Sequence, residues 1–144
     1  MRDYWWYKVG EIDQPHKSGL ISYAFVREQK NFAQIKKGVW KWYRSCVGNK
    51  KLNTGAKLVL WALVERFRME TFSSHDSITY YAKMVGMNRR SVGRSIQELV
   101  EKEIIWCVLE DQENIRLKKS QTSGKKHYLF VGLGVSLIDE KIPS

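Results

Sequence analysis

The apolar residues in the middle of the chain follow helical spacing. From Thr54 to about Met69 they occur on nearly every side of a helix, for which Thr54 is the expected N-cap. A helix that is apolar nearly all round has to be buried on several sides. We therefore expect this segment to be the central helix of the protein core.

A second and shorter helix is predicted downstream. Its expected cap is Asp76 or Ser77, and its expected end is Gly86, which can supply a left-handed residue for a tight turn. Its apolar positions recur at intervals of three and four residues: Ile78, Tyr81, Ala82 and Val85. We expect it to brace the helix that follows.

A third helix is predicted immediately after the glycine turn, with Asn88 as its cap. One stripe of this helix is apolar and consists of Val92, Ile96, Leu99 and Val100. The opposite stripe is basic and polar and consists of Arg90, Arg94 and Gln97. The third helix is therefore predicted to bury one side and to present positive charge on the other.

After the third helix, the apolar spacing changes to the alternation that is typical of strands. Residues 104–109 and 126–131 predict two antiparallel strands that form a hairpin. Their connection contains Ile115 and Leu117, which are candidates to extend one strand, and a polar tip that is rich in lysine. Three helices followed by a hairpin predict an α+β fold of the winged helix-turn-helix type.

Residues 1–51 predict an extension of short strand and helix elements. Residues 20–26 and 32–36 are the expected strands, and residues 39–47 are the expected short helix. We divide the chain into this aromatic and basic extension, which is expected to pack on the core, a winged-helix domain at 52–136, and a C-terminal tail at 137–144.

The charge of the chain favours a polyanionic partner. The 144 residues carry 25 Lys and Arg against 15 Asp and Glu, a formal net charge of +10. Such a field attracts nucleic acids. Most of the excess lies outside residues 53–110, which hold eight basic and seven acidic side chains, so overall charge is weaker evidence than the cluster between Asn88 and Arg94.

No motif in the sequence predicts catalysis, a metal or a cofactor. Cys46 and Cys107 are far apart and lack the spacing of a zinc site or a disulfide framework. The histidines are isolated in sequence, and no phosphate-binding glycine loop or catalytic elbow occurs. Tyr80 and Tyr81 lack the histidine pair of a nicking enzyme and are interpreted as packing or phosphate-contacting residues. We expect a protein that is not an enzyme and has no cofactor.

A membrane location is not expected. The longest apolar run, residues 58–64, is far shorter than the roughly 20 residues that cross a bilayer. The N-terminal residues include Asp3 and amphipathic aromatics where a signal peptide needs an apolar stretch. These features predict a cytoplasmic protein.

Four stretches of the chain together resemble prokaryotic winged-helix modules. They are Leu52–Leu63, Ser77–Ala82, Val85–Val92 and Ile96–Ile105. The resemblance is greatest to phage and plasmid replication initiators of the lambdoid origin-binding type, and similar modules occur in transcriptional regulators. It covers about residues 52–131. It implies a protein that binds duplex DNA.

The predicted contact residues lie on the third helix and in the wing. Arginine can bond guanine bidentately, so Arg90 and Arg94 are expected to contact base edges. The lysines of the wing are expected to neutralise phosphates. The full set of predicted DNA-binding residues is Asn88, Arg89, Arg90, Ser91, Arg94, Gln97, Lys118, Lys119, Lys125 and Lys126.

Several alternatives remain open at this point. The wing lysines could belong to a merely solvated loop, and the arginines could pair with Glu98 or Glu101. The aromatic N-terminal segment could pack on the core, form a dimer contact or stack on single-stranded DNA. The function is origin binding or transcriptional regulation, with a non-catalytic interaction module of the replication or transfer machinery as the rival. Homodimerisation and replication or transfer proteins as partners are also left open.

Overall fold

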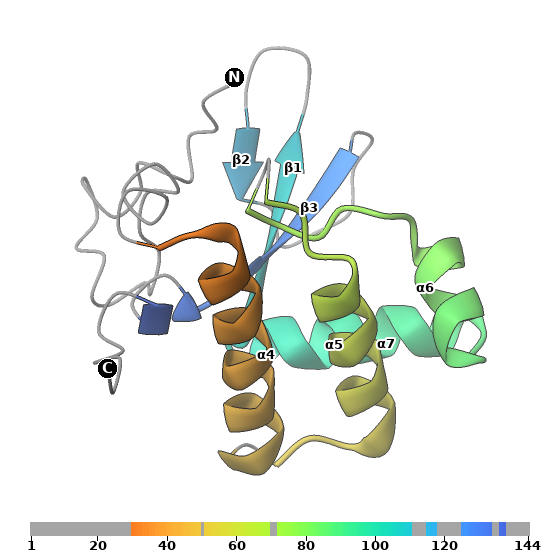
Figure 1. Cartoon of the computed structure of the whole chain (residues 1–144). Coiled ribbons are helices and arrows are strands. Elements are labelled where there is room, and N and C mark those ends of the chain that lie inside the picture. Colours follow the sequence, from red (N-terminus) through yellow and green to blue (C-terminus); the bar gives the residue numbers. More distant parts are fainter. Residues whose placement is uncertain are drawn as a thin grey trace. The chain divides into compact units, whose positions relative to one another are not determined.

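The computed structural model describes residues 30–49, 51–69, 72–110, 115–117, 125–133 and 136–137 (Figure 1). Helices and an antiparallel sheet give it an α+β fold, as the apolar spacing predicted. The chain divides into two compact units, one formed by residues 1–44 with 131–144 and the other by residues 45–130. The predicted strand at residues 20–26 lies outside the described residues.

The central helix of the 45–130 unit is α5, Thr54–Glu65. Its N-cap is Asn53, whose side chain accepts a hydrogen bond from the Ala56 N–H at 2.8 Å, so the prediction of Thr54 as the cap is wrong. The helix ends well before Met69 because Arg68 forms an antiparallel bridge with Ser73 through two backbone hydrogen bonds of 2.9 and 3.3 Å. The turn closed by this bridge therefore ends the helix, although the apolar residues continue at helical spacing to about Met69.

The prediction that α5 is buried on several sides is confirmed, but one stripe of the helix is exposed. The side chains of Leu58 and Trp61 are 43% and 36% exposed to solvent. They share this stripe with Thr54, Lys57 and Glu65, at helical intervals along α5. The buried side is formed by Ala56, Val59, Leu60, Ala62, Leu63 and Val64.

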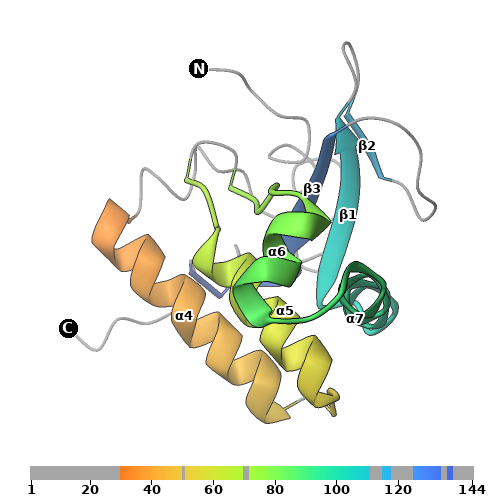
Figure 2. The same ribbon diagram turned by 90° about the vertical axis from the view of Figure 1, so that its right-hand side faces the viewer.

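The next two helices, α6 (Ile78–Val85) and α7 (Arg89–Glu101), confirm the sequence prediction. Ser77 caps α6 by accepting a hydrogen bond from the Tyr80 N–H. Gly86 ends α6 in the left-handed region, with φ of 68°, where a residue without a Cβ is least strained. In Figure 2, α7 is viewed almost end-on, with α6 beside it and β1 rising from its end.

The sheet has the strand order β2-β1-β3, with both pairs antiparallel. Its strands are β1 (Ile105–Glu110), β2 (Ile115–Leu117) and β3 (Lys125–Phe130). Residues 115–117, which include the two candidates to extend a strand of the hairpin, instead form a separate strand on the other edge of β1. Pairing with β1 is favoured because it provides hydrogen-bond partners for the backbone N–H and C=O groups on that edge of β1.

The connection between α5 and α6 joins the remaining edge of the sheet. Ser74 pairs with Tyr128 of β3 through two backbone hydrogen bonds of 3.1 and 2.7 Å. The Tyr81 hydroxyl lies 2.6 Å from the Ser74 hydroxyl and accepts a hydrogen bond from the Asp76 N–H at 2.9 Å. Burial raises the pKa of Tyr81 to about 12, so its hydroxyl stays protonated as a link between helix and sheet.

Helix α4, Phe32–Asn49, begins in the 1–44 unit. The prediction of a strand at residues 32–36 is therefore wrong, whereas the helix predicted at residues 39–47 is confirmed as part of this longer helix. Asn31 and Gln34 form a capping box, in which each backbone N–H donates to the other side chain at 2.9 Å. The two hydrogen bonds of this capping box fix the start of the helix ahead of Ile35, the first buried residue of its apolar stripe.

The apolar stripe of α4 is held in its own unit by specific contacts. Ile35, Val39 and Trp42 are buried at helical spacing. The Trp42 Nε1–H donates a hydrogen bond to the Val131 carbonyl at 2.9 Å, and the Leu137 side chain occupies the space beside Gly38. Among the described residues, no helix has the length and apolarity that a membrane crossing requires.

Candidate nucleic-acid interface

The candidate site is built on α7, whose rotation is fixed by its buried side. Val92 and Leu99 are fully buried, Ile96 is 8% exposed, and Ser95 is buried with them. The helix packs against α5 and α6. With one side held in this way, helical geometry directs the opposite side of α7 outward.

The outward side of α7 carries the residues that were predicted to contact bases. Arg90, Arg94 and Gln97 are all exposed. Arg90 and Arg94 are one turn apart, so both guanidinium groups project from the same side. The structure therefore brings together the three residues on which the prediction of base contact depends.

The remaining predicted residues of α7 lie at its start and flanks. Asn88 is exposed, but its Oδ1 accepts a hydrogen bond from the Ser91 N–H at 2.8 Å, so only its Nδ2 is left to donate outward. Arg89 is exposed, and Ser91 is half-buried. These positions suit contacts to a backbone phosphate better than contacts deep in a groove.

The arginines of α7 do not pair with the acids of the same helix. Among the described residues, no ion pair involves Arg90 or Arg94. Glu98 instead accepts a hydrogen bond from the Asn53 N–H at 3.2 Å and pairs with Lys102 at 3.2 Å. The positive charge of Arg90 and Arg94 is thus not neutralised by an ion pair among the described residues.

The C-terminal half of α7 has a different character. Glu101 is exposed and accepts a hydrogen bond from the Gln97 Nε2 at 3.2 Å. A carboxylate on the outward side repels phosphates, so a nucleic acid would contact the first turns of α7 and not its end. Gln97 marks the boundary between these two halves.

Gly93 lies on the flank of the same helix without a packing reason for being glycine. A Cβ at this position would have no atom within 4 Å. Glycine in a helix interior costs about 0.5–1 kcal/mol relative to alanine. The helix therefore bears a stability cost that no contact among the described residues explains.

The predicted wing is described only in part. Lys118 and Lys119 lie outside the described residues, and of Lys125 only the backbone in β3 is described. Lys126 is half-buried in β3. Burial raises the pKa of the Cys107 thiol, although the nearby charge of Lys126 acts to lower it.

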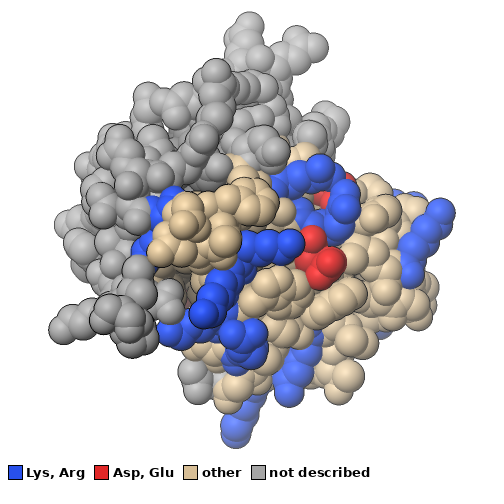
Figure 3. Space-filling model, in the orientation of Figure 1, with Lys and Arg blue, Asp and Glu red and all other residues tan. Residues whose placement is uncertain are grey.

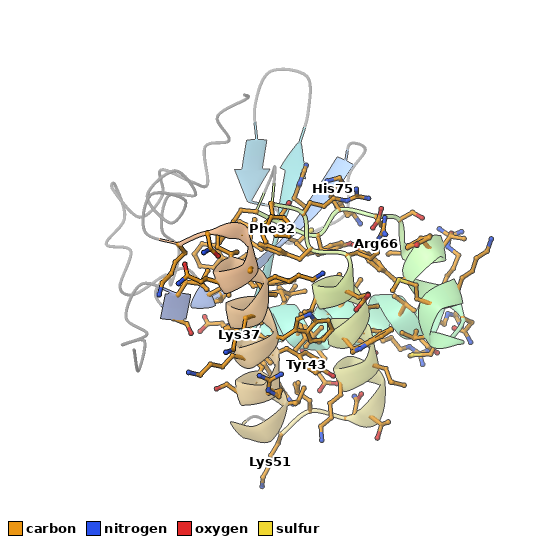
Figure 4. All side chains as sticks on the ribbon, in the orientation of Figure 1. Phe32, Lys37, Tyr43, Lys51, Arg66 and His75 are labelled. Atoms are coloured by element: carbon orange, nitrogen blue, oxygen red, sulfur yellow. The ribbon has the colours of Figure 1, made fainter. Side chains whose placement is uncertain are left out.

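A charged cluster beside α6 was missed by sequence reasoning. Asp76 Oδ2 lies 2.7 Å from Arg66 Nε, and its Oδ1 lies 3.2 Å from Arg68 Nη2. The Arg66 guanidinium also lies 4.9 Å from the centre of the Tyr80 ring, which is 41% exposed. Figure 4 shows Arg66 in this region. The sequence does contain a signal for this cluster, namely Asp76 just before α6 and the two arginines just after α5.

Electrostatics hold this cluster in its charged form. Burial favours a higher pKa for the Asp76 carboxyl, but the hydrogen bond and charge of Arg66, with those of Arg68, lower it below its usual value. Tyr81, next along α6, is fully buried, so the two neighbouring tyrosines have separate roles.

Two histidines that are isolated in sequence are close in space. The rings of His75 and His127 are 4.9 Å apart, and His127 Nδ1 lies 2.9 Å from the Ser73 hydroxyl. His127 is fully buried, and His75 lies beside β3 (Figure 4). Within the described ranges, no three His, Cys, Asp or Glu side chains are grouped as metal ligands would be.

Comparison with known proteins gives no relative for this arrangement. No family model, curated protein or solved structure matches the chain.

Proposed function

We propose that the chain is a winged-helix protein that binds duplex DNA at specific sequences. Its role would be origin binding in replication or transcriptional regulation, of the phage or plasmid type, in the cytoplasm. The observation that carries the proposal is the outward side of α7, where Arg90 and Arg94 are exposed and take part in no ion pair among the described residues.

The order of the elements supports the winged-helix part of the proposal. Within the 45–130 unit, helices α5, α6 and α7 precede the antiparallel strands, and the α5–α6 connection pairs with β3 at Ser74. In a winged helix, the helix that follows the tight turn enters the major groove while the hairpin lies beside it. Helix α7 follows the Gly86 turn and is the corresponding helix here.

The proposed roles follow from side-chain chemistry. Arg90 and Arg94 would bond guanine bidentately, each contributing about 1–3 kcal/mol of discrimination. Arg89, Ser91 and the Nδ2 of Asn88 would contact phosphates at the start of the helix. Gln97, already bonded to Glu101, would contribute least.

The test is a double substitution, Arg90→Ala with Arg94→Ala, in the full chain. Its probes are a duplex enriched from a random library by the wild-type protein and an unselected random duplex. We expect selectivity between the two to fall at least tenfold, because losing two bidentate contacts of about 1–3 kcal/mol each exceeds the roughly 1.4 kcal/mol that corresponds to a factor of ten.

The matched control is Lys51→Ala with Lys57→Ala. Both lysines are exposed, and Lys57 lies on the outer stripe of α5, so this variant removes the same net charge without changing α7. The control should keep the selectivity. Equal selectivity in all three proteins would reject the assignment of α7 and favour a protein-interaction module.

A further inference from the structure

Helix α4 presents a second cationic surface, which we call the α4 basic face. It consists of Lys36, Lys37, Lys41 and Arg44, all of them exposed. The 18 residues of α4 contain no Asp or Glu. Blue side chains accordingly gather over α4 in Figure 3, and Lys37 is labelled on it in Figure 4.

The spacing of the α4 basic face concentrates its charge. From Lys36 to Arg44 the helix rises by about 12 Å, a distance along which duplex DNA carries on the order of seven phosphate charges. Because no carboxylate is interspersed along α4, each ammonium or guanidinium group there faces no opposing charge from its own helix. The face is therefore complementary to a polyanion.

The apolar side of α4 argues against insertion into a membrane surface. A basic amphipathic helix binds a lipid surface by burying its apolar stripe in the headgroup region. In α4 this stripe is already buried, at Ile35, Val39 and Trp42, and Trp42 is hydrogen-bonded to Val131. Apart from Phe32 at the start of the helix, which is 65% exposed, the large exposed side chains of α4 are polar or charged.

One aromatic ring lies within the α4 basic face. Trp40 is half-buried and follows Lys36 and Lys37 by one helical turn, while Arg44 lies one turn beyond it. Its ring meets Tyr43 edge-on, with centroids 5.7 Å apart. Single-strand binding requires several rings on which successive bases stack. Besides Trp40 and its edge-on neighbour Tyr43, both half-buried, α4 carries Phe32, which is 65% exposed one turn before Lys36. Because only one of these rings is mostly exposed, phosphate contact is favoured over base stacking.

We propose that the α4 basic face binds the phosphates of duplex DNA and adds sequence-independent affinity to the site on α7. This inference rests on the proposed function of α7. Lysine suits the task because its ammonium group is a point charge on a flexible stem, which neutralises phosphate without reading a base.

The test compares the full chain with the variant Lys36→Gln, Lys37→Gln, Arg44→Gln. The probe is a random-sequence duplex, titrated between about 50 and 200 mM salt. Each lost phosphate contact lowers the log–log salt slope by about 0.9, so we expect a reduction of about 2.7. The ratio of affinities for the enriched and random duplexes should stay unchanged.

The charge-preserving variant Lys36→Arg, Lys37→Arg, Arg44→Lys is the control. It should bind with the wild-type slope, and a loss there equal to that of the glutamine variant would overturn the inference. An unchanged slope in the glutamine variant would overturn it as well. So would a loss confined to single-stranded DNA, or a loss of binding to anionic phosphatidylserine vesicles alone.

The α7 variant separates this inference from the function on which it rests. If Arg90→Ala with Arg94→Ala reduces selectivity while the α4 variant keeps its slope, the proposed function stands and the α4 inference fails. If the slope falls in the α4 variant while the α7 variant keeps full selectivity, the α4 contact is supported and the role of α7 is rejected.

Discussion

Helices α4 and α7 both bury one side and present basic residues on the other, but they distribute charge differently. In α4 the basic residues are mostly lysine and no acid accompanies them. In α7 they are all arginine, they are confined to the first turns, and Glu98 and Glu101 follow them. A helix with charge along its length can bind a polyanion in many registers, whereas a helix with charge at one end favours a single docking position.

The chemistry of the two cations adds to this contrast. Arginine presents a planar fork of donors that matches the edge of a base, while lysine presents a hydrated point charge. Positive charge can therefore serve discrimination on α7 and bulk attraction on α4. The helices also differ in net charge, because α4 carries four basic residues and no acid, whereas the three arginines of α7 are partly offset by two glutamates.

The largest expected effect comes from loosening α7. Leu99 is fully buried, and Leu99→Ala should lower the free energy of unfolding by about 2–5 kcal/mol, because it leaves a cavity under the helix. Urea unfolding measures this loss. Leu58→Ala, at a position that is 43% exposed, is the control and should cost far less. Similar losses in both variants would contradict the view that one side of α7 anchors it.

A smaller effect is expected at the two helix starts. Asn88→Ala and Asn31→Ala each remove an N-cap, and each should cost about 1 kcal/mol in thermal or urea unfolding. Only Asn31 takes part in a reciprocal capping box with Gln34, so Gln34→Ala should also weaken α4. The equivalent change in α7, Ser91→Ala, leaves the backbone donor of its cap in place and should have little effect.

The smallest effect distinguishes two glycines. Gly93→Ala in α7 should raise stability by about 0.5–1 kcal/mol, because a Cβ there meets no atom within 4 Å. Gly38→Ala in α4 should show no such gain, since its Cβ would meet the Leu137 side chain. Differential scanning calorimetry compares the two. A destabilised Gly93→Ala variant would show that the space beside α7 is not open.

Local signals explain which elements the sequence revealed. Ser77, Gly86 and Asn88 act on neighbouring backbone groups, so the bounds of α6 and the start of α7 followed from residue type. The start of α4 was missed because Phe32, Ala33, Gln34 and Ile35 show an irregular mixture of polar and apolar residues. The capping box of Asn31 and Gln34 has the three-residue spacing that marks a helix start in sequence, so this signal was present in the sequence and was missed.

Features that depend on distant segments were harder to predict. The separate strand β2 and the pairing of Arg66 and Arg68 with Asp76 require contacts that no spacing rule specifies. On α7, by contrast, helical periodicity alone predicted that Arg90, Arg94 and Gln97 would be exposed. The candidate site was therefore predictable where it lies on one helix, and its surroundings were not.

The pairing of Ser74 with Tyr128 has a consequence for how the 45–130 unit folds. The neighbouring residues Ser73 and His127 are 54 positions apart in sequence, so this edge closes a long loop. Chain entropy penalises such closure until much of the intervening structure exists. We expect α5, α6 and α7 to form first and this edge of the sheet to pair last. The pairing step then limits the folding rate.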